Sequence, residues 1–128
     1  MSTPTTVSNI GVVMFTVADQ DAACAFYTEK LGYEVRGDSR FGENGEYRWL
    51  EVAPPGSTAR IALNPPMFGD PGGSAIGVET PDLKAEHARL SAIGGVDMDD
   101  LPEQPEPGAP ALFMVKDPDG NVITIVEM

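Results

Sequence analysis

Two segments of the chain share one pattern of apolar and polar positions. In the first segment, the apolar and β-branched run 10–17 predicts a strand. Asp19 fits a helix N-cap, and Asp21 adds a negative charge to the first turn, where it suits the helix dipole. Apolar residues then recur at helical spacing as far as Gly32, which is typical of a helix C-terminus. A second strand is predicted to begin at 33–35.

The second segment repeats this order of elements. Residues 75–78 predict a short strand. Thr80 is predicted to be a helix N-cap and Pro81 the first helical residue, where a missing N–H costs nothing. The glycine pair 94–95 ends the predicted helix, and Val96 begins another strand.

The two segments match at one fixed offset, which relates Val17 to Val78 and Val35 to Val96. Each segment is followed by two more strand-like runs with a turn between them. These runs are EYRWLEVAP and ARIALNP in the first half, and ALFMVKD and NVITIVEM in the second half. The repetition predicts an α+β fold built from two tandem βαβββ modules.

A length of 128 residues suits one domain, 1–128. The modules are predicted at about 8–65 and 73–128, with the loop 65–73 between them. A second loop, DMDDLPEQPEPGAP, has four prolines and five acids and is therefore not a central strand. It can be a lid over a pocket or a solvated connection.

The composition narrows the classes of partner. Eight basic and twenty acidic residues give a net charge of −12, which argues against binding to nucleic acid or to an anionic membrane surface. The same charge permits a cationic partner. The single cysteine cannot form an internal disulfide. Neither a signal peptide nor a run long enough to span a bilayer is apparent, so we expect a cytoplasmic protein.

The stretch DPDGN, residues 117–121, has two acids at the spacing of a calcium loop. The following residues, VITIVEM, do not supply the closing Glu that such a loop needs. Pro118 and Gly120 suit a tight turn. We therefore predict a hairpin turn, which sets the register of the last strand.

Two stretches carry a resemblance to a known family. VADQDAACAFYTEKLGYEV and KDPDGNVITIVE resemble the signatures of the vicinal oxygen chelate superfamily, and the match runs from about 8 to 127. That superfamily includes glyoxalase I, extradiol dioxygenases, fosfomycin-resistance enzymes and bleomycin-resistance proteins. The resemblance implies mixed sheets that curve into a cup, and a homodimer with its cups across or beside the interface. Whether the modules pair within a chain or between chains is left open.

The metal-dependent members of that superfamily hold a divalent ion with His, Glu or Gln side chains. The resemblance transfers the four ligand positions to Val12, Ala62, Gly73 or Ser74, and Thr124. None of these residues is a strong ligand. The single histidine, His87, lies within a predicted helix. We therefore expect no catalytic metal and no cofactor.

Strand alternation and the resemblance together predict which side chains line the cup. The candidate ligand-binding residues are Met14, Phe41, Trp49, Glu51, Ala62, Met114 and Thr124, although alternation does not fix the faces of Phe41 and Met114. Trp49 can stack on a planar ligand, and a cationic group can lie against its ring or pair with Glu51. The alternative is that Trp49 packs in the core or in a dimer interface.

These features favour a metal-free protein of the bleomycin-resistance type, which carries no catalytic residue and, as a homodimer, binds a small hydrophobic or aromatic molecule that can be cationic. The alternative is an enzyme, either a glyoxalase-like lyase or isomerase or a dioxygenase type, with displaced or absent metal ligands. Glu51 or Tyr47 could act there as a lone general acid or base. An accessory role in secondary metabolism is a third hypothesis.

Overall fold

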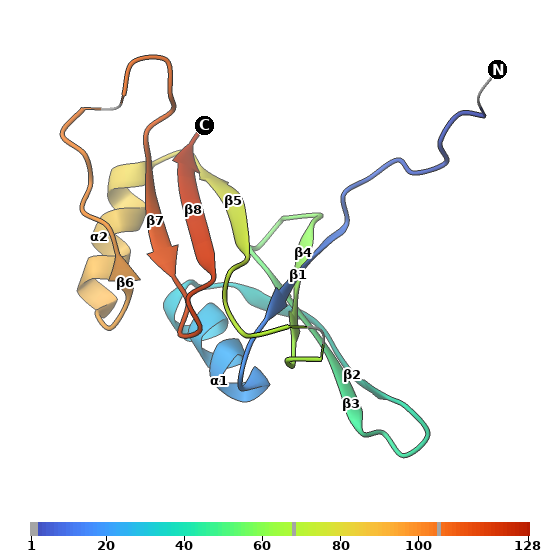
Figure 1. The fold of residues 1–128 in the computed structure, drawn as a ribbon. Helices are drawn as coiled ribbons and strands as arrows, with labels where there is room; N and C mark the ends of the chain where they lie inside the picture. Colours follow the sequence, from blue (N-terminus) through green and yellow to red (C-terminus); the bar gives the residue numbers. More distant parts are fainter. Residues whose placement is uncertain (1–2, 68, 105) are drawn as a thin grey trace.

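The computed structural model describes residues 3–67, 69–104 and 106–128. It contains two four-stranded mixed sheets, each accompanied by one helical segment (Figure 1). The strand order is β1-β4-β3-β2 in the first sheet and β5-β8-β7-β6 in the second, so the two halves of the chain build the same topology. The predicted α+β fold of two βαβββ modules is confirmed.

The first module contains four strands and one helical segment. Its elements are β1 (Val12–Thr16), α1 (Gln20–Ala25), a π-helical turn η1 (Phe26–Lys30), β2 (Glu34–Phe41), β3 (Tyr47–Ala53) and β4 (Arg60–Asn64). Strand β1 runs parallel to β4, whereas β3 is antiparallel to both of its neighbours. The hairpin formed by β2 and β3 extends away from the rest of the chain (Figure 1).

The second module repeats the arrangement with a shorter edge strand. Its elements are β5 (Ala75–Thr80), α2 (Leu83–Ile93), β6 (Asp97–Met98), β7 (Leu112–Lys116) and β8 (Val122–Glu127). The first two residues of the acidic, proline-rich stretch form β6 at the edge of the sheet, and the strand ends before the prolines, which cannot donate to a strand ladder. Leu101 of this loop packs against the core, and its neighbours 103–104 and 106–110 are exposed.

The helix beginnings confirm one prediction and correct another. Asp19 caps α1, because its carboxylate accepts a hydrogen bond of 3.0 Å from the Ala22 N–H. The prediction of Thr80 as a cap was wrong, since Thr80 is still paired with Glu127 in the β5–β8 ladder. The cap of α2 is Asp82, so Pro81 precedes the helix. Helix α2 therefore begins later than its sequence pattern indicated.

One hydrophobic core joins the two modules. Both sheets contribute the side that faces the helices, and the most deeply buried large side chains include Phe15, Tyr27, Leu50, Ile61, Leu63, Leu90, Phe113 and Ile123. Along β4, Ile61 and Leu63 face the helices, and Ala62 between them faces the other way. The opposite face of each sheet lies outside this core.

The DPDGN stretch forms a tight turn between β7 and β8, as its sequence predicted. The Gly120 N–H donates to the Asp117 carbonyl at 3.0 Å, and the Asp117 N–H donates to the Asn121 carbonyl at 2.9 Å. Gly120 has a φ of 92°, a conformation that favours glycine. The Asp117 side chain is only 4% exposed and accepts hydrogen bonds from the backbone N–H groups of Asp119 and Asn121.

The DPDGN turn also binds the first module. The Tyr27 hydroxyl donates to the Asp117 carboxylate at 2.9 Å, and the Asn121 side-chain amide donates to the Thr16 carbonyl at 3.0 Å. The Ala18 N–H donates to the Asp119 carboxylate at 3.1 Å. These three bonds fix the second module against the first.

A second set of contacts between the modules lies at the helix ends. The guanidinium of Arg89, on α2, donates to the carbonyls of Lys30 and Leu31 at 3.2 and 2.9 Å. In return, the Lys30 ammonium donates to the Gly94 carbonyl at 3.0 Å, where α2 ends. Each helical segment thus receives a cation from the other module at its negative C-terminal end.

We expect Tyr27→Phe to lower the free energy of unfolding by about 1–2 kcal/mol, because it removes one donor from a buried carboxylate. Urea unfolding followed by circular dichroism checks this. Tyr47→Phe is the matched control, since Tyr47 is 40% exposed on the β2–β3 hairpin. An equal loss in both variants would contradict the role assigned to the Tyr27 hydroxyl.

Stability is also expected to fall at alkaline pH. Burial, reinforced by the Asp117 carboxylate, raises the pKa of Tyr27, and burial likewise raises the pKa of Tyr33. In the unfolded chain these hydroxyls lose their protons near pH ~10, whereas in the folded chain they keep them. The stabilisation is therefore complete below that pH and is lost as the pH rises above it. Unfolding free energies measured across this range should fall less steeply for Tyr27→Phe than for the native chain.

Candidate functional site

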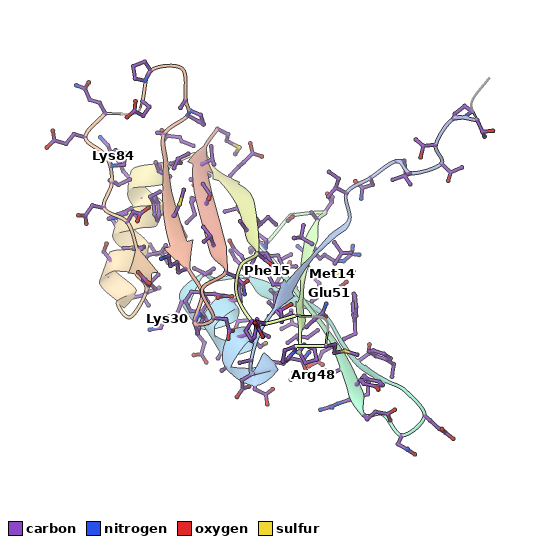
Figure 2. All side chains as sticks on the ribbon, in the orientation of Figure 1. Met14, Phe15, Lys30, Arg48, Glu51 and Lys84 are labelled. Atoms are coloured by element: carbon purple, nitrogen blue, oxygen red, sulfur yellow. The ribbon has the colours of Figure 1, made fainter. Side chains whose placement is uncertain are left out.

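The first sheet presents a face that points away from α1 and from the core. We call it the open face of the first sheet, and define it as Val12, Met14 and Thr16 of β1, Arg60, Ala62 and Asn64 of β4, Tyr47, Trp49 and Glu51 of β3, and Gly37, Ser39 and Phe41 of β2. Met14 and Glu51 lie close together on this sheet (Figure 2). Leu50 and Val52, which alternate with Trp49 and Glu51 along β3, lie in the core instead.

One row of residues crosses the middle of this open face. Met14 pairs with Ala62, Ala62 pairs with Glu51, and Glu51 pairs with Gly37. Ala62 is fully buried, although it lies on the side away from the core cluster. A Cβ on Gly37 would lie 3.5 Å from a carboxylate oxygen of Glu51, so the Glu51 side chain extends over Gly37. Because Ala62 and Gly37 are small, Met14 and Glu51 are the larger groups of this row.

Glu51 holds its two larger neighbours in place. The Trp49 indole N–H donates to one carboxylate oxygen at 3.0 Å, and Nε of Arg60 donates to the other at 3.0 Å. The Glu51 side chain is 13% exposed and the Arg60 side chain 39%. Trp49 is therefore oriented by a polar bond on the open face and does not belong to the core cluster.

Phe41 lies near the tip of the β2–β3 hairpin. It pairs with Tyr47 across the hairpin, and the centroids of the two rings are 5.2 Å apart. Both rings are exposed. The sequence did not fix the face of Phe41, and the register with Tyr47 places it on the open face.

The remaining two candidate residues lie on the second sheet. Met114 and Thr124 are paired neighbours on the face opposite the core. Phe113 points the other way and packs edge-on against His87, with ring centroids 4.9 Å apart. The ring of His87 also contacts the Asp99 carbonyl at 3.0 Å. The predicted site residues thus fall into two groups, one on each sheet.

The positions transferred from metal-dependent proteins do not fit a metal ion. Val12, Ala62 and Thr124 carry no carboxylate or imidazole, and neither does Ser74. Within residues 3–67, 69–104 and 106–128, no three His, Cys, Asp or Glu side chains converge as metal ligands would.

Three hollows in the described part of the chain are lined by residues other than Trp49. They have volumes of about 430 to 490 Å³. Two of them are lined by both modules, and one of these two contains Arg89, whose guanidinium is already bonded to Glu86 and to two carbonyls. In the described part of the chain, no helix is long and apolar enough to cross a membrane.

The fold and sequence identify the family. A model of the Glyoxalase/Bleomycin resistance protein/Dioxygenase superfamily matches residues 9–125. The chain belongs to this superfamily. Among curated proteins, the uncharacterized protein YetH of Bacillus subtilis strain 168 is 33% identical over 124 residues, which are 94% of this chain and 99% of YetH.

Two solved structures of the superfamily show how closely the fold is shared. One is a member from Sphaerobacter thermophilus, 29% identical, with a TM-score of 0.83 over 95% of this chain and 98% of its own. The other is TnmS3, an antibiotic binding protein from Streptomyces sp. CB03234. It is 32% identical, with a TM-score of 0.80 over 97% of this chain and 98% of its own.

Neither the sequence nor the family resemblance predicted the contacts that Arg60 and Gly37 make with Glu51. Arg60 lies nine residues after Glu51 along the chain, and only the β3–β4 register brings the two side chains together. The opposite charges on two successive strands were the available signal.

Glu51→Ala should make Trp49 more accessible to acrylamide quenching, because the variant lacks the oxygen that holds the indole. The cost in stability should stay below about 1 kcal/mol, since the ion pair is partly exposed. Trp49 is the single tryptophan, so its fluorescence reports on this position alone. Glu43→Ala, at the exposed tip of the same hairpin, should leave the quenching unchanged. Equal quenching in all three proteins would contradict the bond between Glu51 and Trp49.

Proposed function

We propose that this chain is a small-molecule binding protein that holds a hydrophobic or aromatic ligand without converting it. The ligand would lie on the open face of the first sheet, against Trp49. The protein would act as a homodimer, need no metal, and protect its host by sequestering the ligand. The observation that carries the proposal is the single tryptophan oriented by Glu51 on an uncovered sheet face.

The composition of the open face supports this proposal. Apolar and aromatic side chains predominate, and Glu51 and Arg60 are its two charged groups. A mostly apolar lining with a few polar groups is the usual make-up of a small-molecule site. TnmS3, which is described as an antibiotic binding protein, shares 32% of its sequence with this chain over nearly the full length of both.

The residues of this chain support the metal-dependent activities of the superfamily less well than they support ligand binding. The transferred ligand positions carry Val12, Ala62 and Thr124, whose side chains bind divalent ions weakly or not at all. Glu51 accepts a hydrogen bond from Trp49 and is paired with Arg60, so its carboxylate already has a structural role. These facts favour binding over catalysis.

The case for a homodimer comes from the geometry of the open face. Ligand sites bury most of the surface of a small molecule, which a single sheet face cannot do. The second sheet has its own open face, with Met114 and Thr124. We propose that the open face of the second sheet in one copy covers the open face of the first sheet in another. The ligand would then be enclosed between Trp49 and Met114.

Met114→Arg tests this arrangement. Met114 is 44% exposed, so we expect its replacement to change the stability of the folded chain by less than about 0.5 kcal/mol. The dissociation constant of the dimer, measured by sedimentation velocity, should rise at least about tenfold, because a charge would be buried in the interface. Quenching of Trp49 by a panel of planar aromatic compounds should weaken in parallel.

Met67→Arg is the matched control, because Met67 is 48% exposed in the connection between the modules. It should leave both dimerisation and quenching unchanged. A native chain that stays monomeric would contradict the dimer. Saturable quenching by none of the compounds would contradict the binding function, and stoichiometric nickel, zinc, iron or manganese in the purified protein would contradict its metal-free character.

A further inference from the structure

The arginines of this chain differ in how fully their guanidinium groups are used. Arg36, Arg48 and Arg89 each form hydrogen bonds through all three guanidinium nitrogens. Arg60 forms one through Nε alone, to Glu51. Among the residues that the structure describes, neither terminal nitrogen of Arg60 has a hydrogen-bond partner. Within the described residues Arg40 forms no side-chain hydrogen bond either, but it lies on the side of β2 away from the open face. Arg60 is thus the guanidinium of the open face, and its terminal donors are unused.

Those unused donors are held in a fixed position. The bond from Nε to Glu51 orients the planar group, and Glu51 is in turn bonded to the Trp49 indole. Arginine keeps its charge at any physiological pH, and its planar fork suits oxygen acceptors. Because the side chain is 39% exposed, a ligand can reach it. Because the donor is oriented before binding, less conformational entropy is lost when the ligand binds.

Glu51 offers less to a cation, because its negative charge is already paired with Arg60. Each of its oxygens already accepts a charged or polar donor at 3.0 Å. A cationic ligand would have to displace Arg60, or approach within reach of its positive charge. The acid on this face therefore works as a support for Arg60 and Trp49.

We infer that the ligand is a planar aromatic molecule that carries an acceptor oxygen, such as a carbonyl or carboxylate, at its edge. This inference rests on the proposed function and specifies the ligand class. The ring would stack on Trp49, and the oxygen would accept hydrogen bonds from the terminal nitrogens of Arg60. The net charge of −12 repels an anionic ligand over a longer range than the contact with Arg60. Salt screens this repulsion beyond about 8 Å under physiological conditions.

Three probes with one ring system test the inference by calorimetry at physiological salt. They are anthracene-2-carboxylate, the neutral anthracene-2-carboxamide, and 2-(aminomethyl)anthracene, which is positively charged at neutral pH. We expect the carboxylate and the carboxamide to bind at least about tenfold more tightly than the amine, as one charge-assisted hydrogen bond would give. Comparison of the first two separates the contribution of an anion from that of a neutral carbonyl.

Arg60→Met should lower the affinity for the carboxylate and the carboxamide by about tenfold and should not weaken binding of the amine. Because this variant leaves Glu51 without its partner, the double variant Arg60→Met with Glu51→Met provides a second test, with the same loss expected for the carboxamide. Arg40→Met is the matched control. It removes the same charge from β2, where Arg40 pairs with Arg48 on the side away from the open face.

The outcomes separate this inference from the proposed function. If the amine binds as tightly as the other probes, or if Arg60→Met and Arg40→Met behave alike, the inference is overturned while the binding function stands. If none of the probes binds the native dimer, the binding function is contradicted and the inference falls with it. Preference for the carboxylate and carboxamide that disappears only in the Arg60 variants supports both.

Discussion

The arrangement of this protein depends on one buried carboxylate. Asp117 accepts four hydrogen bonds, from the Tyr27 hydroxyl, the Asp119 N–H, and both the backbone and side-chain N–H groups of Asn121. A carboxylate removed from water is costly unless every lone pair finds a donor, so the four donors must assemble together. One of them belongs to the first module. Gly72, in the connection, lies so close to this turn that a Cβ there would collide with the Asp119 carbonyl. The turn therefore fixes how the two modules meet.

This junction determines which surfaces are left for function. The helix-facing sides of both sheets merge into one core, and large apolar side chains on the opposite faces, such as Met14 and Met114, remain exposed. The second module brings its own open face, but Met114 lies on a different sheet from Trp49. A chain built in this way buries enough apolar surface to fold and still exposes Met14, Phe41 and Met114. Those exposed side chains are what a ligand or a second copy would cover.

The sequence predicted the fold well because strands have a period of two and helices have recognisable ends. Alternation along β3 and β4 placed Trp49, Glu51 and Ala62 on one face, and the strand register shows that they share it. It failed along β2, because an irregularity between Val35 and Gly37 shifts the register, so counting from Val35 does not give the face of Phe41. The cap at Thr80 was wrong for a similar reason, since strand pairing with β8 persists through that residue. A local sequence pattern does not show at which residue the pairing of two strands ends.

The overall charge of the chain is a poor guide to the charge of the site. Eleven of the twenty acids lie in 73–128, against three basic residues, whereas the open face of the first sheet carries one acid and one base. The acidic composition suggested a cationic ligand, and that reasoning treated Glu51 as free. The β3–β4 register instead gives Glu51 a partner and leaves Arg60 with donors to spare. At contact distance a local pair outweighs charges that are screened by solvent, because Coulomb energies fall with distance and with the effective dielectric constant. The chemistry of the open face is therefore set by the unused terminal nitrogens of Arg60. The net charge of the chain has little influence on it.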